Sequence, residues 1–415
     1  MKKLWFIVVL LVACKTESQM EPEPPSETGP KYETYGYAGF TKEEKQAYHK
    51  HLLEGGSRRY GGDHSRFYFL NYAELEKHSR ILRSDTPKIL EETPRADVQN
   101  FLTPKHLKTG GGLPLTKYIK QAEVDGLIIV HKGKIVFEGY PRMFPTDFHV
   151  NYSVTKIYVS TAVGILEDRG LLDSRQPIDT YLEALKGSDW EGIPIVDILA
   201  MSSGMESGSS SQKLRTAYTT QEQIKALASA KSVKPSGTEY DYRGINTAML
   251  TLLVEEVSGL TFSDFLEQEI WRKIGSEFNG LLGKRSNGLA ATSSYGVSST
   301  LRDLARFGLA YTPSGRKGSN PIVSDAHLAR IRDVNKNLKA KSWFSEDIKY
   351  PGHQWDEIYE DGDFYKGGHA GQGLYISPSR DLVIAFYGTY DVNKKEHQLP
   401  AISRQLAKSG LFDLE

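Results

Sequence analysis

Two stretches rich in apolar and β-branched residues, one in the middle of the chain and one near its end, predict strands. Over residues 126–140, two apolar runs flank the turn His131-Lys132-Gly133-Lys134, a pattern typical of a β-hairpin. Over residues 373–387, two further runs flank Pro378-Ser379-Arg380. An amphipathic pattern over about residues 399–409 predicts a final helix.

Between these stretches the apolar positions recur with a helical period. After Ser153 they fall at Val154, Ile157, Tyr158, Ala162, Ile165 and Leu166. Thr219 with Glu222, and Thr300 with Asp303, are typical of helix N-termini. The order strands, helices, strands, helix predicts one α/β domain over residues 113–415, with a helical insertion over roughly residues 166–285.

The N-terminal residues have the pattern of an export signal. Lys2 and Lys3 precede an apolar run over residues 4–13, which is too short to span a bilayer and ends at Cys14, the only cysteine. The segment Leu11-Val12-Ala13-Cys14 resembles a bacterial lipobox. It implies that residues 1–14 are a lipoprotein signal peptide and that lipidated Cys14 anchors an exported protein in the membrane of the cell envelope, at the periplasmic face or the outer membrane. An ordinary secretory signal is the alternative.

The next segments are polar. Residues 15–32 are rich in Glu, Pro and Ser, which predicts a disordered tether. Residues 33–112 are interpreted as an irregular N-terminal extension with helix-like patches at about residues 42–53 and 72–82. The histidines in it lack the spacing of metal ligands, so no metal site is predicted.

Composition narrows the functional class. The chain has 415 residues, of which 39% are apolar and 25% charged, as in ordinary soluble proteins. Basic and acidic residues number 52 each, so no basic surplus points to nucleic acid.

Ser153 and Lys156 are the main candidates for chemistry. Residues three apart lie on one face of a helix, so the amine can reach the hydroxyl. A serine becomes a nucleophile when a neighbouring base removes its proton, and a lysine can be that base when its charged form is disfavoured. The alternative is a helix-capping serine beside a surface lysine.

Two later segments add to this pair. Tyr242 lies in a turn-rich loop over residues 235–246, and a phenol can donate or accept a proton. A glycine-rich run over residues 366–373 enters a strand, where free N–H groups can bind a developing oxyanion. A packed tyrosine and a plain turn are the alternatives.

Together the three segments resemble the penicillin-recognising serine hydrolases, which include class C β-lactamases, D-alanyl-D-alanine carboxypeptidases and 6-aminohexanoate-dimer hydrolases. The family's three motifs match Ser153 to Lys156, Tyr242 to Gly244, and His369 to Gly371, and the resemblance covers about residues 113–410. It implies a β-lactamase/transpeptidase-like α/β fold, an antiparallel sheet flanked by helices with an inserted all-helical domain. Lys108-Thr109-Gly110 also spells the third motif, but it precedes Ser153 and is interpreted as chance.

The resemblance also implies roles. Ser153 would form an acyl-enzyme, with Lys156 and Tyr242 moving its proton, and the backbone N–H groups of Ser153 and Gln372 would form the oxyanion hole. Asn246, His369 and Gly371 would bind substrate, and no cofactor or metal would be needed.

Departures from the family pattern favour an esterase or amidase over a β-lactamase. Gly244 replaces a side chain that often assists, and His369 replaces a lysine that receives a substrate carboxylate. A small ester, amide or peptide is therefore the expected substrate. A D-amino-acid-specific peptidase or carboxypeptidase, a weak β-lactamase, and a catalytically silent binding lipoprotein are the alternatives. Aromatic residues between Trp343 and Tyr365 are proposed to rim the acyl pocket.

Overall fold

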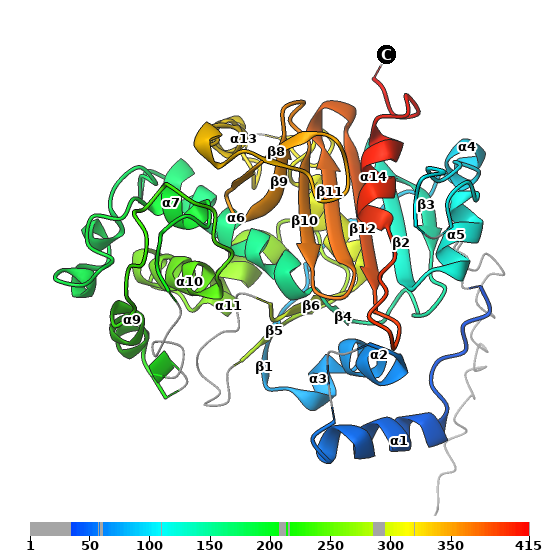
Figure 1. Ribbon diagram of the computed structural model, residues 1–415, viewed down its shortest axis with the longest axis horizontal. Helices are drawn as coiled ribbons and strands as arrows, with labels where there is room; N and C mark the ends of the chain where they lie inside the picture. The colour runs from blue at the N-terminus through cyan, green and yellow to red at the C-terminus, as the bar shows by residue number, and fades with distance from the viewer. Residues whose placement is uncertain are drawn as a thin grey trace, which may run out of the picture. The chain divides into compact units, whose positions relative to one another are not determined.

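The predicted hairpin and the predicted C-terminal strands meet in one antiparallel sheet (Figure 1). β2 (Val124–His131) pairs with β3 (Lys134–Gly139) and, on its other side, with β12 (Leu382–Gly388), which pairs with β11 (Gln372–Ser377). The strand order is β3-β2-β12-β11-β10-β9-β8-β7. Four strands were not predicted: β7 (Ala340–Lys341), β8 (Ile348–Gly352), β9 (Trp355–Tyr359) and β10 (Phe364–Gly368).

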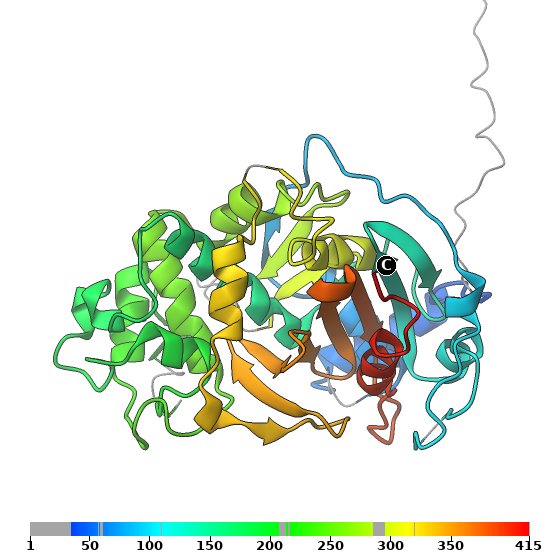
Figure 2. The ribbon, with the colours of Figure 1, turned by 90° about the horizontal axis from the view of Figure 1, so that it is seen from above.

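The sheet is covered on both faces, which explains why its central strands are apolar throughout. Ile128 and Val130 of β2 enter one core cluster together with α12 (Leu301–Leu309). The alternate residues Leu127 and Ile129 enter another, with α5 (Leu115–Gln121) and α14 (Leu399–Ala407). In Figure 2, α14 lies against the sheet near the C-terminus.

The predicted insertion is helical. It follows α6 (Thr155–Asp168), the helix expected after Ser153, and Thr219 forms the predicted capping box with Glu222. Further helices among the described residues are α7 (Ile195–Leu199), α9 (Thr220–Ala228), α10 (Gly244–Ser258), α11 (Phe262–Phe265), the π-helical segment η4 (Leu266–Trp271) and, after the insertion, α13 (Asp325–Arg332).

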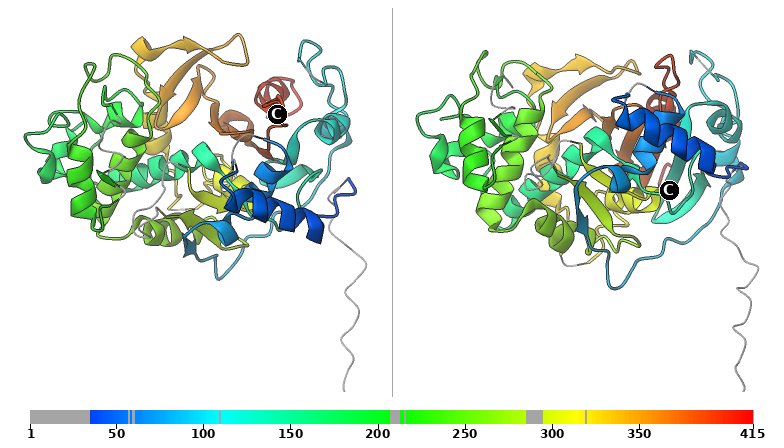
Figure 3. Two further views of the ribbon diagram at one scale, coloured as in Figure 1. Left: turned by 60° about the horizontal axis from the view of Figure 1, so that its bottom comes forward. Right: turned by 90° about the horizontal axis from the view of Figure 1, so that it is seen from below.

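The extension is more ordered than predicted. It contains α1 (Lys42–Leu53), α2 (Asp63–Leu70), α3 (Tyr72–Leu75), β1 (His78–Ile81) and α4 (Ala96–Gln99). The patch at residues 72–82 is only partly helical, because β1 pairs with β5 (Gly280–Gly283) in a second sheet of order β1-β5-β6-β4. β6 (Val297–Ser299) and β4 (His149–Val150) complete that sheet. Residues 32–415 form one compact unit, so the extension belongs to the main fold (Figure 3).

This computed structural model describes residues 35–414 except 57, 59–60, 109, 207–212, 215, 285–294 and 319. The predicted signal peptide, Cys14 and the tether of residues 15–32 lie outside the described residues. Within the described ranges, no helix is both long and apolar enough to cross a membrane.

Candidate active site

Ser153 and Lys156 have the geometry that their spacing predicts. Ser153 lies in the 3₁₀ turn η1 (Tyr152–Val154), which leads directly into α6. The Lys156 Nζ lies 3.2 Å from the Ser153 hydroxyl. Lys156 is buried, so loss of hydration, and then the nearby charge of Lys366, hold its pKa well below the ordinary range. The alternative of a surface lysine is therefore wrong, and the pair consists of a hydroxyl beside an amine that favours its neutral form.

Tyr242 brings the second predicted segment to this pair. It lies just before α10, and the Lys156 Nζ is 4.9 Å from the centre of its ring. Although 40% of the residue is exposed, burial of its hydroxyl raises the pKa of Tyr242, against the opposing effects of Lys366 and of a hydrogen bond with the Ser153 side chain. The phenol therefore keeps its proton at neutral pH and contacts the nucleophile.

Lys366 and Asp356 complete the charge arrangement, and sequence reasoning missed both roles. The Lys366 Nζ lies 3.2 Å from the Tyr242 hydroxyl and forms a buried ion pair with Asp356 on β9. Burial opposes the charge of Lys366, but the Asp356 carboxylate outweighs it and raises the pKa. A lysine thus lies three residues before His369 and beside Tyr242, but Lys366 is not part of the cavity wall. The form Lys-x-Gly in Lys366-Gly367-Gly368 was the signal that could have identified it.

The glycine-rich turn differs from the prediction at Gln372. Gln372 is buried, its side-chain amide donates to the His369 carbonyl at 2.6 Å and accepts from the Gly388 N–H at 3.0 Å, and it does not line the cavity beside Ser153. Gly367, Gly368 and His369 line that cavity instead. These contacts concern the side chain of Gln372, so its backbone N–H as the second oxyanion donor stays a prediction, although the residue lies outside the cavity wall.

Glycines are needed where this turn meets the nucleophile segment. A Cβ at Gly368 would lie 2.6 Å from the Asn151 carbonyl, so only glycine permits this approach of β10 to η1. Gly371 has φ +106°, and a Cβ there would lie 2.7 Å from His397 Nε2. Gly371 does not line the cavity, so its predicted contact with substrate is replaced by a conformational role.

Asn246, predicted to bind substrate, points into the protein interior. It is buried, its Oδ1 accepts a hydrogen bond from the Ser203 hydroxyl at 2.5 Å, and its amide contacts Met201 Sδ at 3.5 Å. It is also absent from the cavity wall. Asn246 therefore links α10 to the segment around residues 201–205, and the structure does not bring it to the substrate side of Tyr242.

The cavity beside Ser153 has a volume of about 800 Å³, and segments far apart in the sequence form its walls. Trp343, Phe344 and Tyr365 form an aromatic wall, as hypothesised for this region, whereas Trp355 and Phe364 belong to the core. The further lining residues are His106, Leu107 and Lys108 from the extension, Tyr390, and residues 396–398, 400 and 401 around the start of α14. Lys108, dismissed above as part of a chance motif, thus lies in the wall of the site.

One carboxylate in this wall has no cation paired with it in the described part of the chain. Glu396 lines the cavity, and burial raises its pKa to about 7. The ammonium of Lys366 is itself committed to Asp356. The lysine nearest the nucleophile after Lys156 is therefore paired, and the positive charge left among the described residues of the wall is that of the exposed Lys108.

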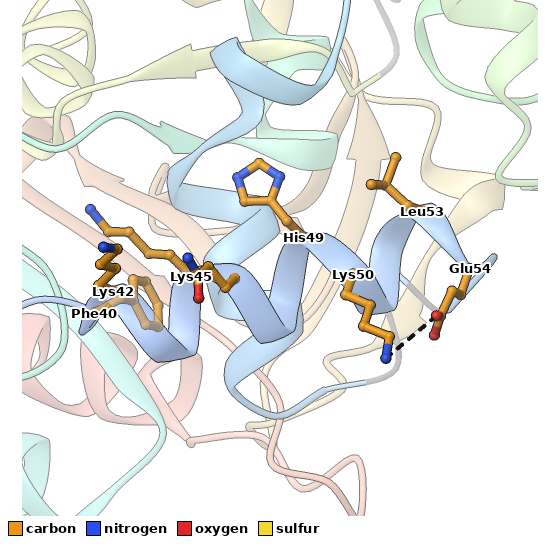
Figure 4. A pocket seen from close by; sticks show the side chains of 8 residues that line it. Phe40, Lys42, Lys45, His49, Lys50, Leu53 and Glu54 are labelled. Carbon is orange, nitrogen blue, oxygen red and sulfur yellow. Dashed lines mark ion pairs between the residues drawn. The ribbon is translucent and has the colours of Figure 1, made fainter.

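A second hollow, of about 760 Å³, lies along α1 and lacks comparable chemistry (Figure 4). Its side chains include three lysines, and Lys50 pairs with Glu54 at 3.8 Å. Leu53 in its rim is 86% exposed. None of its eight lining residues has a hydroxyl or thiol, so the cavity beside Ser153 is the candidate active site. Across the described residues, no group of three or more His, Cys, Asp and Glu side chains could hold a metal ion.

Comparison with known proteins agrees with this geometry. The sequence model of the β-lactamase family matches residues 116–408. The 6-aminohexanoate-dimer hydrolase of Paenarthrobacter ureafaciens is 25% identical over 341 residues, which cover 77% of this chain and 84% of that protein.

Solved structures show the same fold. A Bacillus anthracis protein assigned as a 6-aminohexanoate-dimer hydrolase superposes with a TM-score of 0.71 at 19% identity, over 84% of this chain and 94% of its own. A family VIII carboxylesterase superposes with a TM-score of 0.53 at 15% identity, over 67% of this chain and 91% of its own.

Proposed function

The chain belongs to the β-lactamase family and is a β-lactamase-related hydrolase, and we propose that it cleaves an ester or small amide through an acyl-enzyme on Ser153. The observation that carries this proposal is the contact of 3.2 Å between the Ser153 hydroxyl and the buried amine of Lys156. A neutral amine at that distance can accept the hydroxyl proton as the oxygen attacks the substrate carbonyl.

Tyr242 would act as the proton donor when the leaving group departs from the substrate. Its raised pKa keeps the phenol protonated, and its hydroxyl lies between the Ser153 side chain and Lys366. As the bond to the leaving group breaks, Tyr242 would donate its proton to that group and regain one from Lys156. Water would then hydrolyse the acyl-enzyme by the reverse sequence.

The backbone N–H groups of Ser153 and His369 would stabilise the oxyanion. Both residues line the cavity, and Gly368 brings β10 against the segment that carries Ser153. A single donor of this kind contributes about 2.7–4 kcal/mol to lowering a barrier. His369 is therefore proposed as the second donor, with Gln372 as the alternative that the sequence predicted.

The charges favour an uncharged or cationic substrate over a carboxylate. Lys366 is fully buried with Asp356, and Glu396 adds negative charge to the wall. The one lysine that the structure describes in the wall, Lys108, lies exposed at its edge in the extension. A penicillin or a D-alanyl peptide would bring its carboxylate into this field. The aromatic wall of Trp343, Phe344 and Tyr365 suits an apolar acyl chain. These features support an esterase or amidase more than a carboxypeptidase or β-lactamase.

The test compares Ser153→Ala with wild type on short-chain p-nitrophenyl esters, simple amides, D-alanyl peptides and a β-lactam. We expect turnover of esters or amides that disappears in Ser153→Ala, with much weaker turnover of the two carboxylate substrates. Wild-type turnover by Ser153→Ala would refute the assignment of the nucleophile. Faster cleavage of D-alanyl peptides than of esters would overturn the proposed substrate class.

We also propose that the enzyme is anchored to the cell envelope through Cys14, on the strength of the lipobox-like segment of residues 11–14. Two or more acyl chains anchor a protein stably, whereas one does so only marginally. Cys14→Ser should move the full-length protein from the membrane fraction to the soluble fraction. An unchanged membrane fraction would contradict the anchor.

A further inference from the structure

An apolar cluster joins the N-terminal extension to the backbone around the nucleophile. We call it the bridging cluster, and its buried members are Leu52, Phe67, Tyr68, Phe69 and Tyr72 from the extension with Val150, Tyr152 and Ala370 from the main domain. The extension lies outside the region that the family model matches, residues 116–408. Figure 1 shows α2 beside β4, the strand that leads to Ser153, and α1 and α3 pack on α2.

Phe69 is the central contact of this cluster. It is fully buried, and its ring packs edge-on against Tyr152 at 5.0 Å and against His149 at 5.6 Å. Tyr152 packs in turn against His369 at 5.3 Å, and His369 against Tyr390 at 5.3 Å. A continuous row of edge-to-face rings therefore runs from the extension across the entrance to the active site.

Two residues in or beside this row of rings have backbone conformations that are unfavourable for any residue other than glycine. Tyr152 has φ +44° and Ala370 has φ +68°, both in the left-handed region. Such conformations persist only where the surroundings enforce them. Tyr152 immediately precedes Ser153, and Ala370 immediately follows His369, so these positions orient the two proposed oxyanion donors.

The extension is fixed to the same region at a second point. The Gly62 N–H donates to the Tyr390 carbonyl at 2.7 Å. A Cβ at Gly61 would lie 2.0 Å from the Asp391 carbonyl, so the two backbones are in direct contact. Phe69 and Gly62 thus hold the extension at both ends of the row of rings.

From these contacts we infer that the N-terminal extension supports catalysis through one positioning residue, Phe69, which acts through Tyr152. This inference rests on the proposed function. Phe69 touches no substrate; its ring keeps Tyr152 in the conformation that points the Ser153 oxygen and N–H into the cavity.

The test uses two substitutions of Phe69 and a matched control in the same helix. Phe69→Leu and Phe69→Met both remove the ring and keep an apolar side chain of similar volume, but the unbranched Met adapts to an irregular space, so that at least one variant is expected to fold. Phe67→Leu is the control, because Phe67 is equally buried on α2 but its ring contacts Phe40 at 5.4 Å and Tyr48 at 5.5 Å, both within the extension. All proteins are compared at a temperature where circular dichroism shows them folded.

For ester hydrolysis we expect both Phe69 variants to lower kcat by about 10- to 100-fold with KM nearly unchanged, since small displacements of a nucleophile have effects of this size. Phe67→Leu should lower the melting temperature similarly but keep kcat close to wild type. Wild-type kcat in a folded Phe69 variant would overturn the inference. An equal loss of kcat in Phe67→Leu would also overturn it, since the effect would then be general destabilisation.

Ser153→Ala, measured in the same assay, separates this inference from the proposed function. If Ser153→Ala is inactive while the Phe69 variants are fully active, only the positioning role is refuted. If Ser153→Ala keeps its turnover, the proposed function is refuted and this inference with it.

Discussion

The ammonium of Lys366 lies 3.2 Å from the hydroxyl of Tyr242, although 124 positions separate the two residues in the sequence. This contact ties the end of β10 to the loop before α10. It also sets the protonation pattern of the site, because a charged Lys366 disfavours a second ammonium at Lys156.

Removing Lys366 should reduce both stability and activity, for separable reasons. Lys366→Met leaves Asp356 buried without its partner, a change that typically costs about 3–5 kcal/mol. In the double variant Lys366→Met/Asp356→Leu no buried charge is left unpaired, so the stability lost in the single variant should largely return while kcat stays low. Urea denaturation and ester kinetics on the three proteins check this. Wild-type kcat in the double variant would show that Lys366 has only a structural role.

The hydrolase activity should be lost as the pH falls into the acid range. Because the pKa of Lys156 is depressed, the amine is neutral above that pKa and becomes protonated as the pH falls through it. kcat/KM should therefore rise with pH and level off in the neutral range. Lys156→Arg, which cannot lose its proton, should be inactive. A rate that is highest at the acid end, or an active Lys156→Arg, would contradict the role of this amine.

Glu396 should tune the preference for charged substrates. With a pKa of about 7, its carboxyl gains negative charge as the pH rises through neutrality. An ester with an amino group at the far end of its acyl chain should therefore have a higher kcat/KM than a neutral ester of equal length, by about 1.5- to 5-fold for one exposed ion pair. Glu396→Gln should remove this gain and leave the neutral ester unaffected. An unchanged ratio of kcat/KM for the two esters would place Glu396 outside the substrate subsite.

The protein should lose stability in mild acid through His327 and His353. Burial lowers the pKa of each to about 3, below the value of about 6.5 expected in the unfolded chain. Their neutral forms stabilise the fold fully above pH 6.5, and this contribution is lost as the pH falls from there toward 3. At pH 5 each histidine costs about 2 kcal/mol.

The test of this acid sensitivity is His327→Phe, because no hydrogen-bond partner is found for either ring nitrogen of His327 in the described part of the chain. The substitution should flatten the fall of the melting temperature between pH 7 and 5. The exposed His106 provides the control, since His106→Gln should leave the slope unchanged. An unaltered slope in His327→Phe would assign the acid sensitivity to other groups.

The sequence predicted those parts of the site that local geometry determines. Ser153 and Lys156 lie on neighbouring turns, so their spacing alone brought them together. Tyr242 was identified by motif order. The partners of Lys366 were not predictable, because the pairing of β10 with β9 decides that Asp356 faces it. Gln372 was assigned through its place after the family's third motif, and only the hairpin between β10 and β11 shows that it lies outside the cavity wall.

The sequence predicted some strands of the main sheet and missed others. Strands β2, β3, β11 and β12 follow clear apolar runs, and their bounds agree with the structure to within a few residues. Strands β8 to β10 mix aromatic, charged and glycine residues. Their sequences therefore lack the regular apolar pattern that predicts a strand, and only their pairing with neighbouring strands identifies them. The extension was interpreted as irregular, because the surface that its aromatic residues bury belongs to Tyr152 and Ala370, far along the chain.

The most direct test of the central claim is mass spectrometry of the protein quenched in acid during turnover of a slow ester. The account predicts a mass increase equal to the acyl group, located on the peptide that contains Ser153, absent in Ser153→Ala and decaying as product appears. Turnover without any acyl adduct, or an adduct on a different residue that forms and decays at the catalytic rate, would contradict the account.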